Sequence, residues 1–221
     1  MTFAAIVVAA GTASRAGGNK QWRSLGGKPV LRWSVEALLA AGAEDVVVVV
    51  AAGAETAAAD ALSGLEGWRT ATGADSRAGS VRNGLEALGG PDDRPVLVHD
   101  AARPFLDRAV IDRVLAGMDG ADGALPALPV ADSLRRGDAG FVSGAVERDG
   151  LWRAQTPQAF RYLTLVKACA GWTETPGPAD EATAVERAGG RVRLVAGDVR
   201  LMKLTYPEDF AMAETLIARR T

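Results

Sequence analysis

The chain has 221 residues, of which 48% are hydrophobic, a content typical of globular proteins and too high for a disordered one. Its 25 Lys and Arg residues nearly balance its 27 Asp and Glu residues, which argues against a protein that binds nucleic acid through bulk positive charge. The single cysteine, Cys169, cannot form an internal disulfide, and the apolar run at the start is too short to cross a membrane. We therefore expect a cytoplasmic protein with one domain over residues 1–221 and with no nucleic-acid or membrane partner.

Short apolar runs alternate with helical patterns along the chain. Predicted strands occupy residues 4–10, 46–52, 69–72, 95–99 and 124–129. The run at 46–52 is apolar at every position, as expected for a strand that is covered on both faces. This alternation predicts an α/β fold with a mostly parallel sheet flanked by helices. In such a sheet, ligands bind beyond the carboxyl ends of the strands.

Helical patterns precede and follow a long polar segment. The patterns before it cover residues 30–42, a segment with Ser80 as its N-cap, and residues 106–118. Those after it cover 159–172, 180–190 and 207–220, where Pro207 suits a first helical position. The polar, glycine-rich segment itself, residues 130–150, is too long for an ordinary connection. Its pattern fits a projecting arm or a surface loop equally well.

A glycine-rich loop that carries Arg15 and Lys20 follows the first predicted strand. Backbone N–H groups of such a turn bind phosphate oxygens, an arginine can hold a polyphosphate through two hydrogen bonds, and a lysine adds a mobile charge. The glycine spacing fits neither the P-loop nor the dinucleotide fingerprint. The place of the loop after the first strand slightly favours a phosphate site over a solvated turn with two surface cations.

Asp100 is the candidate metal ligand, because it lies at the tip of the apolar strand at 95–99. A carboxylate there suits Mg²⁺, which takes one or two carboxylates together with phosphate oxygens. The alternative is that Asp100 caps the following turn and pairs with Arg103. His99, the only histidine, is expected to be a packed and hydrogen-bonded residue and not a general base.

Three further polar residues give weaker signals. Lys203 is expected on a short strand, on the same face as Leu201, where it either snorkels to the surface or points into a phosphate site. Arg148 ends the segment 130–150, and Thr156 is expected to be extended because Pro157 follows it. The residues around Arg148 and Thr156 indicate no function for either.

Taken together, these segments resemble the 2-C-methyl-D-erythritol 4-phosphate cytidylyltransferases, which catalyse the third step of the non-mevalonate isoprenoid pathway. The matching segments, in order, are AAG followed by Arg15 and Lys20, GGKPVL, GADSRAGSVRNGL, VHDAARPF, LWRAQTPQAF, DEATAVE and MKLTYPEDFAMAE. The resemblance covers nearly the whole chain. It implies a Rossmann-like nucleotidyltransferase fold with a projecting β-arm. It also implies transfer of CMP from CTP to methylerythritol phosphate, with Mg²⁺ or another divalent cation.

The resemblance assigns the nucleotide to two segments of this chain. It implies that Ala9, Ala10 and Gly11 approach CTP. It implies that Asp75 and Ser80 contact the cytosine and the ribose.

The resemblance assigns the charged residues to the reacting groups. It implies that Arg15 and Lys20 hold the CTP phosphates, that Asp100 carries Mg²⁺, and that Lys203 binds the phosphate that reacts. Whether Asp198 assists the metal is left open.

The resemblance places the second substrate at a boundary between subunits. It implies that Arg103 and Thr156 face methylerythritol phosphate. It also implies that the arm crosses to a second copy of the chain, where Arg148 grips the substrate phosphate. This arrangement would make the protein a homodimer with shared active sites.

The opening loop departs from the family pattern. Ala13 and Ala16 stand where the family has glycine and methionine, Asn19 stands where proline is common, and Ala74 replaces an expected glycine. These changes suggest one rival function, a nucleotide-binding regulator without activity, although the cations and Asp100 are intact. A second rival is a cytidylyltransferase that acts on ribitol 5-phosphate. A nicotinamide oxidoreductase is disfavoured, because the glycine spacing is wrong and no acidic residue ends the second strand.

Overall fold

A single central sheet organises the computed structural model, which describes residues 2–11, 20–90, 93–170, 172 and 178–218. Its strands follow the order β10-β7-β11-β6-β1-β4-β5, and β12 pairs with β7. Their bounds are β1 (Phe3–Val8), β4 (Ala43–Val50), β5 (Trp68–Thr72), β6 (Pro95–Asp100), β7 (Gly123–Pro129), β10 (Trp152–Ala154), β11 (Gln158–Arg161) and β12 (Val192–Ala196).

The sheet is parallel through its centre. Strand β1 pairs in parallel with both β4 and β6, β4 pairs in parallel with β5, and β12 pairs in parallel with β7. Among the strands that the structure describes in this sheet, β10 and β11 alone run against their neighbours. The expected α/β fold with a mostly parallel sheet is therefore confirmed.

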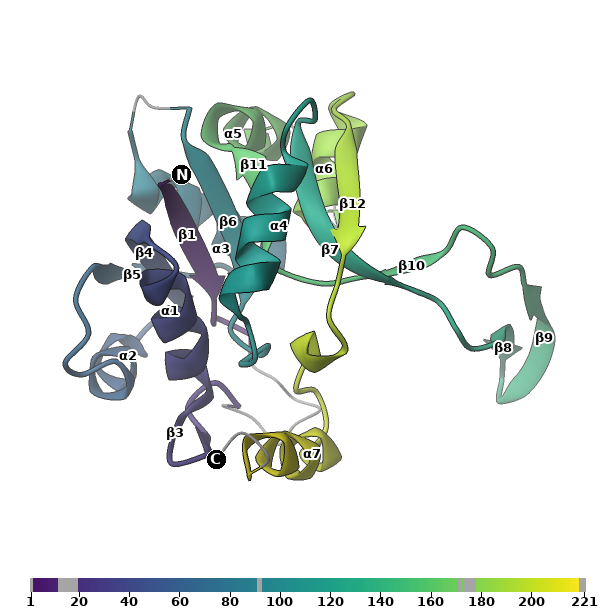
Figure 1. Cartoon of the computed structure of the whole chain (residues 1–221), viewed down its shortest axis with the longest axis horizontal. Coiled ribbons are helices and arrows are strands. Elements are labelled where there is room, and N and C mark those ends of the chain that lie inside the picture. The colour runs from purple at the N-terminus through teal and green to yellow at the C-terminus, as the bar shows by residue number, and fades with distance from the viewer. Residues whose placement is uncertain (1, 12–19, 91–92, 171, 173–177, 219–221) are drawn as a thin grey trace.

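Helices cover both faces of the sheet (Figure 1). On one face, α1 (Val30–Ala40), α2 (Glu55–Ala61) and α4 (Arg108–Gly117) pack on a core that includes Phe3, Ala5 and Val7 of β1. On the other face, α3 (Arg77–Leu88), α5 (Tyr162–Ala170) and α6 (Glu181–Arg187) pack on Ala4 and Ile6. Because successive strand residues face opposite sides, a strand buried twice must be apolar throughout.

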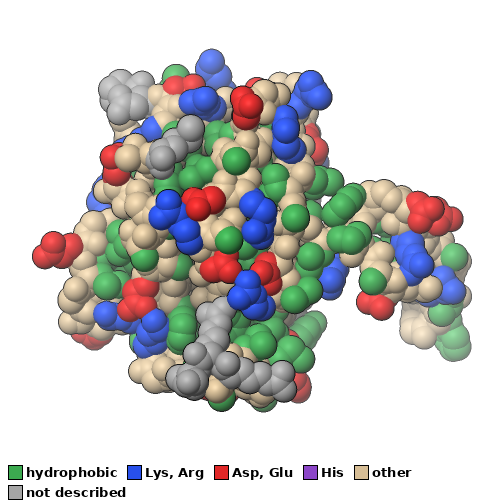
Figure 2. Space-filling view, in the orientation of Figure 1, with side chains coloured by type: hydrophobic (Ala, Val, Ile, Leu, Met, Phe, Trp, Pro, Cys, Tyr) green, Lys and Arg blue, Asp and Glu red, His purple; other side chains and the backbone are tan. Residues whose placement is uncertain are grey.

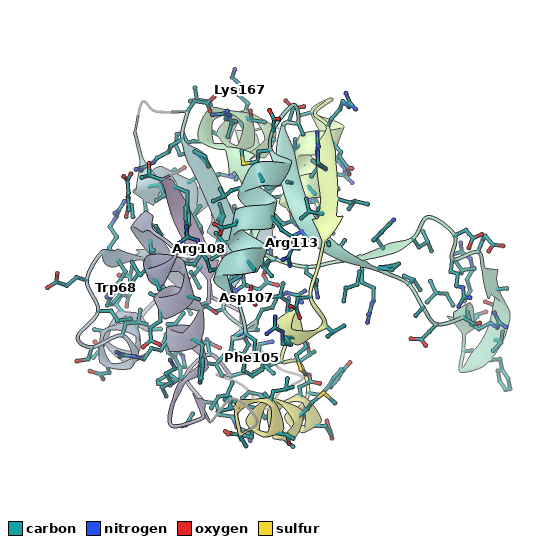
Figure 3. The ribbon with its side chains drawn as sticks, in the orientation of Figure 1. Trp68, Phe105, Asp107, Arg108, Arg113 and Lys167 are labelled. Atoms are coloured by element: carbon teal, nitrogen blue, oxygen red, sulfur yellow. The ribbon has the colours of Figure 1, made fainter. Side chains whose placement is uncertain are left out.

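A third apolar cluster closes the carboxyl end of the sheet. The short strands β2 (Ser24–Leu25) and β3 (Lys28–Pro29) lie there with the 3-10 turn η2 (Val199–Leu201) and the last helix, α7 (Pro207–Ala218). Leu25, Leu204 and Phe210 are buried together with Phe105, which is labelled above α7 in Figure 3. This cluster fixes the chain around Lys20 and Lys203 at the edge where a ligand is expected.

Two local predictions are wrong. The helix expected to follow Ser80 begins at Arg77, because Ser76 is its N-cap and its Oγ accepts a hydrogen bond from the Gly79 N–H at 3.0 Å. Lys203 is not on a strand: it follows η2 in an unpaired segment. The strand expectation fails because Leu201 and Leu204, three residues apart, are both fully buried. By contrast, α7 begins at Pro207 as predicted.

The segment 130–150 forms an arm that stands away from the body in Figure 1. Its strands, β8 (Leu134–Asp138) and β9 (Phe141–Val146), pair with each other in an antiparallel hairpin. Hydrophobic side chains lie along its outer end in Figure 2, and the Phe141 side chain is 80% exposed. The expected projecting β-arm is therefore confirmed.

In the part of the chain that the structure describes, no helix combines the length and the hydrophobicity needed to cross a membrane. The cytoplasmic location expected from the sequence stays a prediction.

Candidate active site

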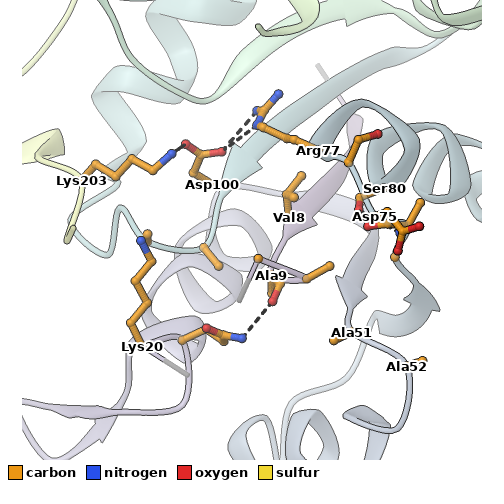
Figure 4. Close-up of a pocket in the computed structure, with 18 residues that line it drawn as sticks. Val8, Ala9, Lys20, Ala51, Ala52, Asp75, Arg77, Ser80, Asp100 and Lys203 are labelled. Carbon is orange, nitrogen blue, oxygen red and sulfur yellow. Dashed lines mark hydrogen bonds and ion pairs between the residues drawn. The ribbon is translucent and has the colours of Figure 1, made fainter. Parts of the chain in front are cut away.

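A cavity of about 520 Å³ lies at the carboxyl ends of β1, β4, β5 and β6 (Figure 4). It is lined by residues from segments that are far apart in the sequence: Val8–Gly11, Lys20, Gln21, Ala51, Ala52, Gly73–Arg77, Ser80, Asp100–Ala102 and Lys203. This is the edge at which parallel sheets bind ligands. The cavity therefore lies where the sequence predicts a phosphate site.

Asp100, the last residue of β6, is the electrostatic centre of the cavity. Its Oδ2 accepts a hydrogen bond from the Lys203 ammonium at 2.8 Å, and its Oδ1 accepts from the Arg77 guanidinium at 3.2 Å. Arg103 Nε lies 3.9 Å from Oδ2. Burial raises the pKa of this carboxyl, but the charges of Arg77, Lys203 and Arg103 outweigh burial and hold the pKa well below its usual range. Asp100 is therefore an anion at neutral pH.

Arg77 and Glu181 form an ion pair beneath Asp100 that the sequence reasoning missed. Arg77 is the first residue of α3, and Glu181, the first residue of α6, is fully buried. The Arg77 guanidinium donates to both Glu181 oxygens, with Nη2 at 3.1 Å from Oε2 and Nη1 on Oε1. Burial lowers the pKa of Arg77, but Glu181 and Asp100 raise it above its ordinary value. Arg77 is thus a fixed cation held between two carboxylates.

Gln158, the first residue of β11, fixes the backbone that presents Glu181. Its Oε1 accepts from the Ala182 N–H at 3.0 Å, and its Nε2 donates to Asp180 at 2.9 Å. Asp180 in turn caps α6 by accepting from the Thr183 N–H at 3.0 Å. The TPQAF and DEATAVE segments of the sequence thus meet in space. Both segments are among the motifs that carry the family resemblance, and this was the only hint in the sequence that Glu181 has a site-forming role.

His99 and Thr156 support Asp100 from behind. His99 is fully buried, and burial lowers its pKa to about 4, so its ring is neutral at pH 7. Its Nε2 donates to the Arg103 carbonyl at 3.1 Å, which leaves Nδ1 to accept from the Thr156 hydroxyl at 3.1 Å. Thr156 Oγ1 accepts from the Asp100 N–H at 3.0 Å. The prediction that His99 is a packed residue is confirmed.

The opposite wall of the cavity is built from backbone. Ala9, Ala10 and Gly11 line it at the end of β1, and the buried Gln21 side chain donates to the Ala9 carbonyl at 3.0 Å. No role for Gln21 was expected from the sequence. Gly73 lies against Ala10 so closely that a Cβ at position 73 would collide with the Ala10 Cβ. The small residues here let a planar group approach the backbone.

Asp75 and Ser80 lie on the same side of the cavity, on the loop that leads into α3 and on the helix itself. The buried Ser80 hydroxyl accepts from the Ala74 N–H at 3.0 Å and donates to the Ala74 carbonyl at 3.2 Å. Ser80 therefore holds the loop that presents Asp75.

Lys20 and Lys203 line the same cavity (Figure 4). The Lys20 ammonium donates to the Leu204 carbonyl at 2.8 Å, so it is tied to the residue next to Lys203. The Leu204 N–H donates to the Ala102 carbonyl at 2.8 Å, two residues beyond Asp100. Residues separated by most of the chain thus place two ammonium groups and a carboxylate around one space.

Comparison with known proteins identifies the family. Residues 3–219 match the family model described as 2-C-methyl-D-erythritol 4-phosphate cytidylyltransferase. The chain belongs to this family. A protein named "Bifunctional enzyme IspD/IspF" from Caulobacter vibrioides is 56% identical over 226 residues, which cover all of this chain and 59% of the relative. A 2-C-methyl-D-erythritol 4-phosphate cytidylyltransferase from Cereibacter sphaeroides is 45% identical, with 99% of this chain and 98% of the relative covered.

Solved structures of cytidylyltransferases share the fold. A crystal structure of 4-diphosphocytidyl-2C-methyl-D-erythritol synthase has a TM-score of 0.85 at 34% identity and covers 98% of both chains. The 2-C-methyl-D-erythritol 4-phosphate cytidylyltransferase from Thermus thermophilus has a TM-score of 0.84 at 32% identity, with 99% of this chain and 100% of that chain covered. The resemblance stated from the motifs is therefore confirmed. The chain spans 59% of the length of the Caulobacter relatives.

Several residues that the cytidylyltransferase motifs suggested lie outside the cavity wall. Arg103 donates to the Leu201 carbonyl at 2.6 Å, and Thr156 lies beneath Asp100. Arg148, between β9 and β10, donates to the Ala131 carbonyl on the arm. Asp198 pairs with Arg200 at 2.6 Å. None of these four residues lines the cavity of its own chain.

Arg15 and the altered positions Ala13, Ala16 and Asn19 lie outside the described residues. Their expected roles stay predictions.

The donor set at Asp100 fits a metal that is shared with a ligand. The described residues contain no group of three or more His, Cys, Asp or Glu side chains that could hold an ion alone. Asp100 instead offers a single hard carboxylate at the wall of the cavity. Mg²⁺ takes such a ligand together with phosphate oxygens and water.

Proposed function

We propose that this chain transfers CMP from CTP to 2-C-methyl-D-erythritol 4-phosphate and releases pyrophosphate. The observation that carries the proposal is the convergence of Lys20, Asp100 and Lys203 on one cavity at the carboxyl edge of the sheet. Family membership supports the substrates, because the matching family and relatives are named for this reaction. A polyphosphate needs clustered cations, and a nucleoside needs the adjoining wall of small residues.

The reaction is an attack by a substrate phosphate oxygen on the α-phosphorus of CTP. A phosphate monoester has a second pKa of about 6, so most of it is already dianionic at pH 7. No general base is required. The burial and neutrality of His99 are therefore compatible with this chemistry.

The barrier is mainly electrostatic, because two anions must approach in line. Lys203 and Lys20 are assigned to the α-phosphate, where positive charge stabilises the transition state. Arg15 is assigned to the leaving pyrophosphate. The nucleoside is assigned to the wall that is lined by Ala9, Ala10, Gly11, Asp75 and Ser80.

Asp100 would hold Mg²⁺ or another divalent cation, which supplies charge neutralisation on the phosphate oxygens. Thr156 and His99 keep the Asp100 backbone in place through their hydrogen bonds. Arg103 braces the adjacent segment by donating to the Leu201 carbonyl. We assign Arg103 and Thr156 to the side of the site that receives methylerythritol phosphate.

The acceptor phosphate is assigned to Arg148 of a second copy of the chain, so the protein would act as a homodimer. The arm supports this, because it extends from the body in Figure 1 and carries Phe141 at 80% exposure. An exposed apolar hairpin of this kind marks a contact surface. Arg148 does not line the cavity of its own chain.

The substrate assignment is tested by pyrophosphate release from each of CTP, UTP, ATP and GTP, with methylerythritol phosphate or ribitol 5-phosphate as acceptor. We expect release with CTP and methylerythritol phosphate that exceeds every other pair by about a hundredfold. Faster release with ribitol 5-phosphate would assign the rival cytidylyltransferase activity. Absence of release from every pair, with CTP still bound, would assign a nucleotide-binding regulator. Reactions without acceptor supply the background rate.

A further inference from the structure

Side chains of the chain itself donate to both oxygens of Asp100. Arg77 donates to Oδ1 from Nη2 at 3.2 Å and from Nε at 3.3 Å, and Lys203 donates to Oδ2 at 2.8 Å. The Asp100 side chain is only 11% exposed. A divalent cation that approaches Oδ2 of Asp100 therefore meets the Lys203 ammonium.

The two partners of Asp100 differ in how firmly they are held. Arg77 is locked by its bonds to the fully buried Glu181 and has a side chain that is 28% exposed. Lys203 has a side chain that is 42% exposed, and its ammonium donates to Asp100. A lysine is a point charge on a flexible stem, whereas a bidentate arginine is fixed in geometry. Lys203 is therefore the partner that can leave.

We propose that Lys203 occupies the metal-binding face of Asp100 until a nucleoside triphosphate draws its ammonium away, so that the metal site forms only when nucleotide is present. Arg77, anchored by Glu181, keeps its hold on Oδ1 throughout and presents Oδ2 to the ion. The inference rests on the proposed function in taking Asp100 as the metal ligand and a nucleoside triphosphate as the ligand of the cavity. It makes Lys203 a gate for the ion as well as a ligand of the reacting phosphate, and it makes Arg77 and Glu181 positioning residues.

The local charge supports this order of events. Arg77, Lys203 and Arg103 all lie within 4 Å of the Asp100 carboxylate, so positive charge surrounds this group. A bare dication is repelled by that charge, and the low exposure of Asp100 weakens solvent screening. A triphosphate has several negative charges. It attracts the Lys203 ammonium, and it binds the dication and brings it into the cavity.

The test uses Mn²⁺ as the probe and measures its free concentration by electron paramagnetic resonance, in the absence of nucleotide. For the wild-type protein we expect no saturable binding below about 1 mM, whereas Lys203→Met should bind Mn²⁺ about tenfold more tightly or better. Adding Asp100→Asn to Lys203→Met should remove the gain. Lys203→Arg keeps a cation on Oδ2 and should behave as the wild type does.

Lys20→Met is the matched control, because Lys20 lines the same cavity but donates to the Leu204 carbonyl and not to Asp100. If Lys20→Met tightened Mn²⁺ binding as much as Lys203→Met, the tighter binding would follow from the loss of any positive charge in the cavity, and the proposed gate would be overturned. Tight Mn²⁺ binding by the wild-type protein, or no gain in Lys203→Met, would also overturn it.

In a second measurement, with CTP present, we expect Lys203→Met to change the affinity in the opposite direction. Lys203→Met should bind the Mn²⁺–CTP complex more weakly than the wild type does, because the variant lacks the ammonium that holds phosphate. Equal or tighter binding of the complex would contradict the exchange of partners. Because these are binding measurements without acceptor, they stand apart from the pyrophosphate-release assay. Failure of that assay would remove the proposed reaction and leave the gate intact.

Discussion

The floor of the cavity and the arm are built in opposite ways. At the floor, Asp100, Arg77, Glu181, His99 and Thr156 hydrogen-bond to one another or to nearby backbone, and most of their surface is buried. On the arm, β8 and β9 pair with each other and their residues are mostly exposed. An isolated two-stranded hairpin is marginally stable in water. The charged centre is therefore formed by the chain alone, whereas the role proposed for the arm requires a second copy of the chain.

The contrast between the cavity floor and the arm is tested most strongly by substitution of Lys203. We expect Lys203→Met to lower the rate of pyrophosphate release by about a thousandfold or more, because it removes a cation from the transition state. The fold should survive, since the side chain is 42% exposed. Steady-state kinetics and a thermal melt measure the two effects. Lys167→Met, on α5 and labelled in Figure 3, is the matched control and should react at the wild-type rate. A Lys203→Met protein with normal turnover would contradict the role of this lysine.

Glu181 tests whether the floor is a single unit. Glu181→Gln leaves Arg77 with one anionic partner, and breaking a buried ion pair costs about 3 kcal/mol or more of the free energy of unfolding. We expect a lower midpoint in urea and a lower rate of pyrophosphate release. Glu186→Gln, on the exposed side of the same helix, should leave both unchanged. Equal midpoints for the two variants would show that the Arg77–Glu181 pair does not support the floor.

Mixing two inactive variants tests whether the arm acts on a second copy. Lys203→Met and Arg148→Ala disable different residues, so a mixed dimer has one site with both residues intact if Arg148 reaches across. Random exchange of subunits should then restore about a quarter of the wild-type activity. The measurement is pyrophosphate release after the variants are co-refolded. No recovery, with exchange verified by a mass-tagged subunit, would place Arg148 in its own chain's site.

The smallest expected effect concerns Cys169 on α5, whose reactivity reports whether the helix layer formed by α3, α5 and α6 admits solvent. Burial and the nearby Glu181 charge raise the pKa of its thiol to about 12. The thiol thus stays protonated up to that pH, and at pH 8 only about one molecule in ten thousand carries the reactive thiolate. We expect no reaction with a disulfide reagent at pH 8 in the native protein, and complete reaction after unfolding in urea. Rapid reaction of the native protein would mean that Cys169 becomes exposed to solvent without global unfolding.

The sequence predicted the features that depend on local patterns. Apolar runs located the central strands, and the polar residue that ends such a run placed Asp100 at the ligand-binding edge. The Arg77–Glu181 pair was not predictable in this way, because the two residues are 104 positions apart and each looks like an ordinary helix start. Ser76 and Ser80 are both good caps, and only the tertiary fold selects Ser76. Lys203 was misplaced because Leu201 is buried in the cluster beneath α1 and α4 and Leu204 in the third apolar cluster, so their burial does not follow strand alternation.

The hydrogen bond from Lys20 to the Leu204 carbonyl has a consequence for engineering. The backbone of Leu204 connects the two lysines to the segment after Asp100. Its N–H donates to the Ala102 carbonyl, its carbonyl accepts from the Lys20 ammonium, and Lys203 is the preceding residue. The Leu204 side chain is packed against Phe210 of α7. The spacing of the two ammonium groups is thus set by an apolar contact outside the cavity. We therefore expect libraries that vary the packing of α7 to change the spacing of the two ammonium groups without substitution of any charged residue.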